Sequence, residues 1–167
     1  MSLPSVSQLI TDLTQQINQY LLTNQIKNPL VVGIHTGGAW IASAVHDGVN
    51  TEQPLASLDI CFYRDDFTQN GLHPVIEATD LPVGIDDLTV ILVDDVIMSG
   101  RTVRAAMNEL FDYGRPARVL LATLLDVGGR ELPIQPDFCA HKLTLAPNQQ
   151  IKLQGPEPLT LNFVDLP

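Results

Sequence analysis

Cysteine and basic residues are both scarce in this sequence. Its two cysteines, Cys61 and Cys139, lie far apart and lack Cys or His neighbours at the usual spacing of zinc ligands. We therefore expect reduced, partly buried thiols and neither a disulfide framework nor a structural zinc site. Nine basic residues against nineteen acidic ones give a formal net charge of -10. Such a charge repels polyanions unless the cations cluster on one face, so it counts against generic nucleic-acid binding.

Long hydrophobic runs are also absent. No apolar run approaches the roughly 20 residues that span a bilayer, and the first residues lack the basic and apolar regions of a secretory signal. We therefore expect a cytoplasmic protein without a membrane partner. Hydrophobic residues make up 45% of the 167 positions, enough for one substantial core. The chain is predicted to form a single domain over residues 1–167.

Apolar strands alternate with helices through the middle of the chain. Helical spacing begins after Ser5, a plausible N-cap, and stops near Asn24. Strand-like runs are predicted at 29–34, 55–63, 88–93 and 119–125, with helices at 39–45 and 101–113. This alternation is typical of a mainly parallel sheet flanked by helices, hence of the α/β class. After Asp126, prolines separate short β-like runs, which predicts a small strand-rich hood over about 126–167.

The segment 90–102 combines an apolar strand, two carboxylates, a short loop and a helix start. Parallel strands deliver their last residues to the crevice where ligands bind, so Asp94 and Asp95 are suited to accept hydrogen bonds from sugar hydroxyls. Gly100 allows the backbone to approach a ligand closely, and the first N–H groups of the following helix suit a phosphate. The pattern therefore predicts a site for a phosphorylated pentose.

This segment resembles the motif with which type I phosphoribosyltransferases bind 5-phosphoribosyl-1-pyrophosphate (PRPP). The segments 63–66, 99–106, 114–116 and 130–134 look like those of the PyrR family, uracil phosphoribosyltransferases that in many bacteria also bind messenger RNA to attenuate pyrimidine biosynthesis. The resemblance becomes thin over the last thirty or so residues. It implies the type I phosphoribosyltransferase fold and the conversion of uracil and PRPP to UMP and pyrophosphate.

The resemblance also implies roles for individual residues. Asp94 and Asp95 would hold the ribose hydroxyls and reach a Mg²⁺ cofactor indirectly, through PRPP and water. Arg64 would close over the pyrophosphate, and Arg130 would lie in the uracil-binding lobe. The 5-phosphate loop would comprise Val96, Ile97, Met98, Ser99, Gly100, Arg101 and Thr102, and the pyrophosphate loop would comprise His35, Thr36, Gly37 and Gly38.

Structural alternatives stay open for three of these residues. His35 also suits a packed histidine at a strand end, and Arg64 a surface arginine paired with a neighbouring aspartate. Arg130 also suits a local ion pair with Glu131, next to a turn at the preceding glycines.

The sequence departs from the family pattern in the pyrophosphate loop. Many relatives carry Arg or Lys at the positions of His35 and Gly37, and a lost charge-assisted contact at a phosphate costs about 1.5 to 3 kcal/mol. This departure motivates an alternative function, a catalytically weak nucleotide-sensing regulator that binds pyr mRNA. Purine-salvage relatives usually carry an acid at the position of Met98, which argues against purine substrates here.

The partners implied by the resemblance are PRPP, uracil, UMP and messenger RNA, together with further copies of the chain in a homodimer or higher homo-oligomer. The acidic net charge argues against the RNA partner. The cations to test for RNA binding are Lys27, Arg104, Arg115 and Arg118.

Overall fold

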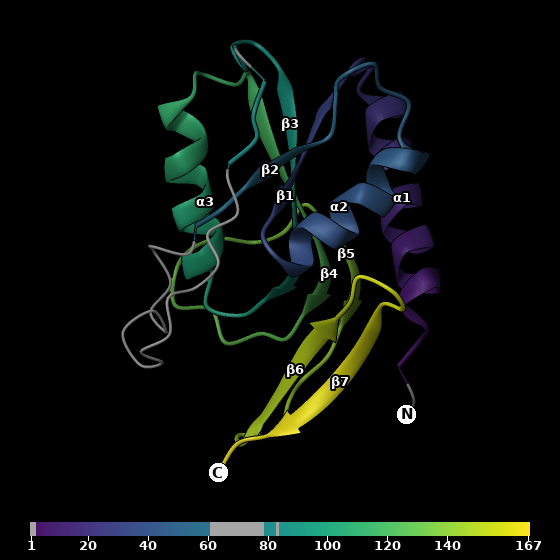
Figure 1. Cartoon of the computed structure of the whole chain (residues 1–167), viewed down its shortest axis with the longest axis vertical. Coiled ribbons are helices and arrows are strands. Elements are labelled where there is room, and N and C mark those ends of the chain that lie inside the picture. The colour runs from purple at the N-terminus through teal and green to yellow at the C-terminus, as the bar shows by residue number, and fades with distance from the viewer. Residues whose placement is uncertain (1–2, 61–78, 83) are drawn as a thin grey trace.

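A parallel sheet forms the centre of the molecule, in a computed structural model that describes residues 3–60, 79–82 and 84–167. In the described part its strands follow the order β2-β1-β3-β4-β5, and every neighbouring pair is parallel (Figure 1). Two further strands, β6 and β7, pair antiparallel in a separate hairpin. The strands are β1 (Leu30–Ile34), β2 (Ala56–Leu58), β3 (Thr89–Ile97), β4 (Arg118–Asp126), β5 (Phe138–Lys142), β6 (Gln149–Gln154) and β7 (Thr160–Asp165).

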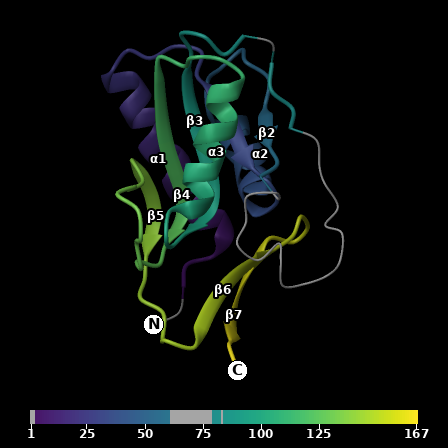
Figure 2. The ribbon, with the colours of Figure 1, turned by 90° about the vertical axis from the view of Figure 1, so that its left-hand side faces the viewer.

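Helices cover both faces of this sheet. The helices α1 (Val6–Thr23) and α2 (Gly37–Gly48) lie on one face and α3 (Arg101–Asp112) on the other (Figures 1 and 2). Strand β3 shows why both faces are apolar: Ile91 and Val93 join the buried cluster under α1 and α2, whereas Val90 and Leu92 join the cluster under α3. Successive strand residues point to opposite faces, so a strand buried on both sides is a continuous apolar run. The predicted α/β class and parallel sheet are confirmed.

Helix α1 begins and ends where the sequence predicts. The Ser5 Oγ accepts a hydrogen bond of 3.2 Å from the backbone N–H of Gln8, which caps the first turn. At the other end the N–H of Asn24 donates to the carbonyl of Tyr20 at 3.0 Å. None of the helices in the described ranges is long and apolar enough to cross a membrane.

Three elements differ from the sequence-based expectation. Strand β3 continues to Ile97 because β4 pairs with it as far as Ile97↔Asp126, so both aspartates lie within the strand instead of the loop. Strand β2 spans only Ala56–Leu58, and residues 61–63 of the expected strand lie outside the described part. Strand β5 pairs with β4 in the central sheet, so of the segment 126–167 only β6 and β7 form a separate sheet.

The β6–β7 hairpin lies at the end of the sheet where β3 and β4 terminate (Figure 1). Ile151 of β6 is buried in the cluster under α1 and α2, which fixes the hairpin to the core. Its turn packs closely on α2: a Cβ atom added to Gly155 would lie 2.8 Å from Cε3 of Trp40. The hairpin therefore stands beside the carboxyl ends of the parallel strands.

Cys139 is a free, half-buried cysteine on β5, as the sequence predicts. Its thiol donates to the carbonyl of His141 at 3.3 Å, and burial raises the pKa of the thiol above its usual value. The prediction for Cys61 falls outside the described residues.

Truncation of Leu13 tests the packing of α1 on the sheet. This side chain is 0% exposed, so Leu13→Ala should lower the free energy of unfolding by about 2 to 5 kcal/mol. Leu22 lies on the same helix and is 77% exposed, so Leu22→Ala should change it by less than about 0.5 kcal/mol. Urea denaturation followed by circular dichroism measures both, and equal losses would contradict this packing.

Candidate functional site

Two aspartates occupy the carboxyl-terminal part of β3. The Asp94 side chain is buried, with only 3% of the residue exposed, and its Oδ1 accepts a 3.0 Å hydrogen bond from the backbone N–H of Asp95. Asp95 itself is half-buried. Beyond them the strand ends at Ile97, next to the last residue of β4, Asp126. The chain thus carries adjacent carboxylates into the region where parallel-sheet proteins bind ligands.

The amino-terminal end of α2 approaches these aspartates so closely that a Cβ atom at either of its first two residues would meet atoms of β3. A Cβ atom on Gly38 would lie 2.5 Å from the carbonyl oxygen of Val93 and 3.0 Å from Cα of Asp94. A Cβ atom on Gly37 would lie 2.6 Å from Cγ of Asp95. The Gly37–Gly38 pair therefore allows the predicted pyrophosphate loop to contact the end of β3.

The predicted pyrophosphate loop connects β1 directly to α2. The backbone N–H of His35 donates to the carbonyl of Leu58 at 2.9 Å, and the peptide between His35 and Thr36 is cis. Thr36 occupies the N-cap position of α2 but makes no capping hydrogen bond with its side chain, and the first turn contains no acidic residue. Because the first N–H groups of a helix have no intrahelical acceptor, this helix start can bind an anion.

A second uncapped helix start follows β3. Gly100 is the N-cap of α3, with φ of 91°, a left-handed conformation that favours glycine. As a glycine, the N-cap residue makes no side-chain capping hydrogen bond, and the first turn has no acidic residue. The Arg101 N–H donates to the Ser99 Oγ at 3.2 Å. The predicted 5-phosphate loop therefore places a second anion-binding helix start just after Asp94 and Asp95.

The connection between β4 and β5 runs alongside this loop and hydrogen-bonds to it. The backbone N–H of Val127 donates to the carbonyl of Ile97 at 3.1 Å. The N–H groups of Glu131 and Leu132 donate to the Ser99 carbonyl at 3.0 and 3.2 Å. We call residues 126–135 the lobe segment, because it contains the region predicted to bind the base. It fixes the conformation of the residues that precede α3.

Comparison with known proteins assigns a family to this arrangement. The model of the phosphoribosyl transferase domain matches residues 2–150. The chain belongs to this family.

Sequence relatives narrow the assignment. The chain is 52% identical over 166 residues to "Bifunctional protein PyrR" of Pseudomonas syringae pv. tomato, covering 99% of this chain and 98% of the relative. It is also 52% identical over 161 residues to the protein of the same name in Pseudomonas aeruginosa PAO1, covering 96% and 95%. The chain is therefore a PyrR homologue, as the resemblance predicts.

Solved structures support the fold. A hypoxanthine-guanine phosphoribosyltransferase from Bacillus anthracis has a TM-score of 0.67 at 19% identity, covering 86% of this chain and 81% of that one. A hypoxanthine phosphoribosyltransferase from Trypanosoma cruzi has a TM-score of 0.65 at 20% identity, covering 85% and 80%. At these identities the likeness concerns the fold alone, and the expected phosphoribosyltransferase fold is confirmed.

Two arginines of the chain, Arg101 and Arg130, form ion pairs that differ from the predicted one. Glu131 pairs with Arg101 at 2.6 Å, where both side chains are more than half exposed, and not with its neighbour Arg130. Exposed pairs of this kind contribute about 0 to 1 kcal/mol. Arg130 pairs instead with Asp126, at 2.7 Å. The role of Arg64 in closing the site stays a prediction, because that residue lies outside the described part.

Lys142 is a candidate functional residue that the sequence analysis did not identify. It ends β5 and lies opposite Asp126 in the register of β4 and β5, beside a cavity of about 270 Å³ that both residues line. The segment 138–142 contains Cys, His and Lys after Phe138, so its pattern did not indicate a strand of the central sheet. Only the pairing of β5 with β4 brings Lys142 to this end of the sheet.

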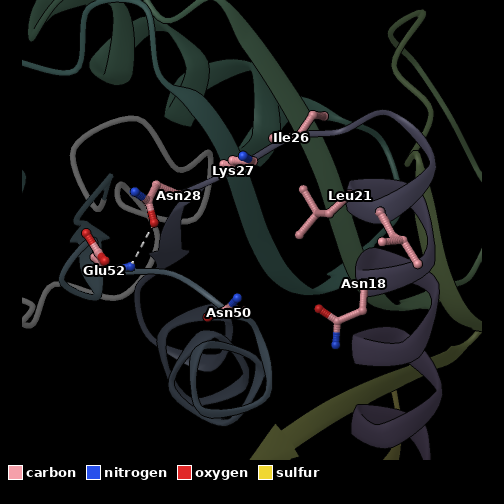
Figure 3. Close-up of a pocket in the computed structure, with 8 residues that line it drawn as sticks. Asn18, Leu21, Ile26, Lys27, Asn28, Asn50 and Glu52 are labelled. Atoms are coloured by element: carbon pink, nitrogen blue, oxygen red, sulfur yellow. Dashed lines mark hydrogen bonds between the residues drawn. The ribbon is translucent and has the colours of Figure 1, made fainter.

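Another cavity, of about 490 Å³, lies at the opposite end of the strands (Figure 3). It is lined by the end of α1 and by the connections before β1 and after α2, with Asn28 Oδ1 accepting a 3.2 Å hydrogen bond from the N–H of Glu52. None of the described residues that are predicted to bind PRPP or uracil lines it, but Lys27, one of the cations to test for RNA binding, does. The predicted PRPP-binding residues that the structure describes gather instead at the carboxyl end of the sheet.

The two glycines at the start of α2 should respond differently to substitution. At Gly38 the added methyl group meets the backbone of β3, so Gly38→Ala should destabilise the fold by about 1 to 3 kcal/mol. At Gly37 it meets only the Asp95 side chain, which can rotate away, so Gly37→Ala should change stability by less than about 1 kcal/mol. Urea denaturation of the two matched variants tests this order, and a reversed order would contradict the described approach of α2 to β3.

Proposed function

We propose that this chain transfers the phosphoribosyl group of PRPP to uracil, forming UMP and pyrophosphate. The observation that carries the proposal is the end of β3, where the Asp94–Asp95 pair is followed a few residues later by the start of α3, whose N-cap Gly100 makes no side-chain capping bond. A carboxylate pair suits the hydroxyls of a ribose, and an uncapped helix start suits its 5-phosphate. The high identity to proteins named PyrR supports a pyrimidine as the accepting base.

In this mechanism the residues position charge and form no covalent bond with the substrate. As the bond between C1 and the pyrophosphate oxygen breaks, positive charge develops on the ribose ring and negative charge on the departing oxygens. Asp94 and Asp95 hold the hydroxyls of the ribose, and the uncapped start of α2 faces the pyrophosphate. Uracil N1 then bonds to C1 and loses its proton, which leaves with the pyrophosphate or solvent. The increase in reaction rate comes from holding both reactants in line.

Mg²⁺ fits this site as a companion of the substrate. The described residues contain no group of three or more His, Cys, Asp or Glu side chains that could hold a metal ion. Asp94 and Asp95 would instead hold the ion indirectly, through PRPP and water. Bound in this way, the ion would neutralise negative charge on the pyrophosphate.

Because Gly37 has no side chain, the pyrophosphate loop can offer only backbone groups to a ligand at this position. The place that a side chain at this position would enter is taken by the Asp95 carboxylate. We infer that backbone N–H groups of Gly37 and Gly38, aided by His35, contact the pyrophosphate where many relatives use a basic side chain. Gly37→Ala should therefore displace Asp95 and raise the KM for PRPP about tenfold, as loss of a hydrogen bond to a charged group does. An unchanged KM, measured by initial rates at saturating uracil, would contradict this role.

The activity itself is tested by mixing the purified protein with PRPP, Mg²⁺ and, separately, uracil, hypoxanthine or orotate. We expect nucleotide formation with uracil only. Asp95→Asn should lower kcat/KM at least about tenfold, because it removes the charge on a ribose contact. Asp112→Asn is the matched control, since Asp112 is exposed at the far end of α3. No UMP, or equal losses in both variants, would overturn the proposal.

A regulatory role is the second candidate, supported by the word "bifunctional" in the name of the relatives. The cations to test for contact with messenger RNA are Lys27, Arg104, Arg115 and Arg118, and all four are exposed. RNA affinity should fall steeply as salt is added, with the slope set by the number of phosphates contacted. A flat salt response of binding to pyr leader RNA would count against this role.

A further inference from the structure

We propose that Arg130 is a positioning residue that holds the 5-phosphate loop and the lobe segment in one fixed arrangement. This inference rests on the proposed transfer to uracil and adds a residue that acts on both substrates without direct contact with the reacting atoms. It differs from the expectation of a direct uracil contact in a way that kinetics can measure.

The Arg130 guanidinium joins three stretches of chain. Its Nε donates to the carbonyl of Ile134 at 2.8 Å, and its Nη1 donates to the carbonyl of Met98 at 2.8 Å. Its Nη2 donates to Oδ2 of Asp126 at 2.7 Å and to Oε1 of Gln135 at 3.3 Å. These bonds use four of the five N–H donors of an arginine. The side chain therefore bridges the end of β4, the 5-phosphate loop and the last part of the lobe segment.

The Arg130–Asp126 pair is largely buried, so its loss should cost more than the loss of the exposed Arg101–Glu131 pair. The side chains of Arg130 and Asp126 are 14% and 9% exposed, whereas those of Arg101 and Glu131 are 55% and 56% exposed. Water screens the exposed pair, but it cannot easily replace either partner of the enclosed one. Removal of the Arg130 guanidinium would leave an enclosed carboxylate and two carbonyl groups without this donor.

Both halves of the proposed site depend on these bonds. Met98 lies in the 5-phosphate loop, two residues before the N-cap of α3. Asp126 also accepts, at Oδ1, a 3.0 Å hydrogen bond from the N–H of Gly128, and it lines the cavity shared with Lys142. A shift of Arg130 would thus move the phosphate-binding backbone and the lobe segment together. Lysine cannot reproduce this arrangement, because it lacks the planar fork of donors.

Steady-state kinetics separates positioning from direct base contact. If Arg130 positions both segments, Arg130→Lys and Arg130→Gln should each raise the KM for PRPP and the KM for uracil about tenfold or more. If Arg130 only contacted the base, the KM for uracil alone would rise. Asp112→Asn is again the control, because Asp112 is exposed at the far end of α3 and should leave both constants unchanged. An unchanged KM for PRPP in the Arg130 variants would overturn the inference.

Two further measurements distinguish loss of positioning from loss of folding. Guanidinium ion at millimolar concentration should restore part of the activity of Arg130→Ala and none of that of Asp95→Asn. Asp126→Asn keeps the shape of the partner and should raise both KM values in the same way. If Arg130→Ala is folded by circular dichroism and guanidinium restores nothing, while Asp126→Asn behaves like the wild type, the inference is wrong.

Failure of the proposed function would be distinguishable from failure of this inference. A wild-type protein that binds PRPP with Mg²⁺ in calorimetry but forms no UMP would overturn the transfer to uracil alone. In that case Arg130→Lys should still weaken PRPP binding about tenfold, because the 5-phosphate loop is held by the same bond to Met98. Unchanged PRPP binding in Arg130→Lys, or no PRPP binding by the wild type, would overturn the positioning role.

Discussion

The close approach of helix α2 to the end of strand β3 is the constraint on which the site depends. Gly38 allows the helix backbone to lie against the carbonyl of Val93, and Gly37 leaves room for the Asp95 carboxylate. A larger residue at Gly38 would push the helix start away from β3, and one at Gly37 would displace the Asp95 carboxylate. Because α2 and α3 both begin after parallel strands and their N-cap residues make no side-chain capping bond, this packing brings the start of α2 against the carboxylate pair that precedes the start of α3. That combination suits a substrate with phosphate at both ends of a ribose.

The site is assembled from three connections that follow strands of one sheet. The connections after β1 and β3 supply the helix starts, and the connection after β4 supplies the lobe segment that hydrogen-bonds to the 5-phosphate loop. The strands are buried on both faces, so their relative positions are fixed by the two apolar clusters. Binding groups on short loops of such a rigid sheet keep their geometry before the substrate arrives, as positioning catalysis requires.

Local patterns predicted much of this structure. Ser5 and Asn24 gave the limits of α1, and the string from Val90 to Thr102 indicated the strand, the acids and the following helix. Long-range pairing was not predictable. The extension of β3 through Asp94 and Asp95 depends on its register with β4, and the place of Lys142 depends on β5. Arg130 likewise pairs with Asp126 and not with its neighbour Glu131, because the folded lobe segment and not sequence distance determines the partner.

A crystal structure of the protein with UMP bound tests the central claim most directly. The account predicts the ribose hydroxyls within hydrogen-bond distance of Asp94 and Asp95, with the phosphate against the backbone N–H groups at the start of α3. The uracil ring should then lie beside the lobe segment. A phosphate bound at another place, such as the cavity between α1 and the connection before β1, would contradict the account.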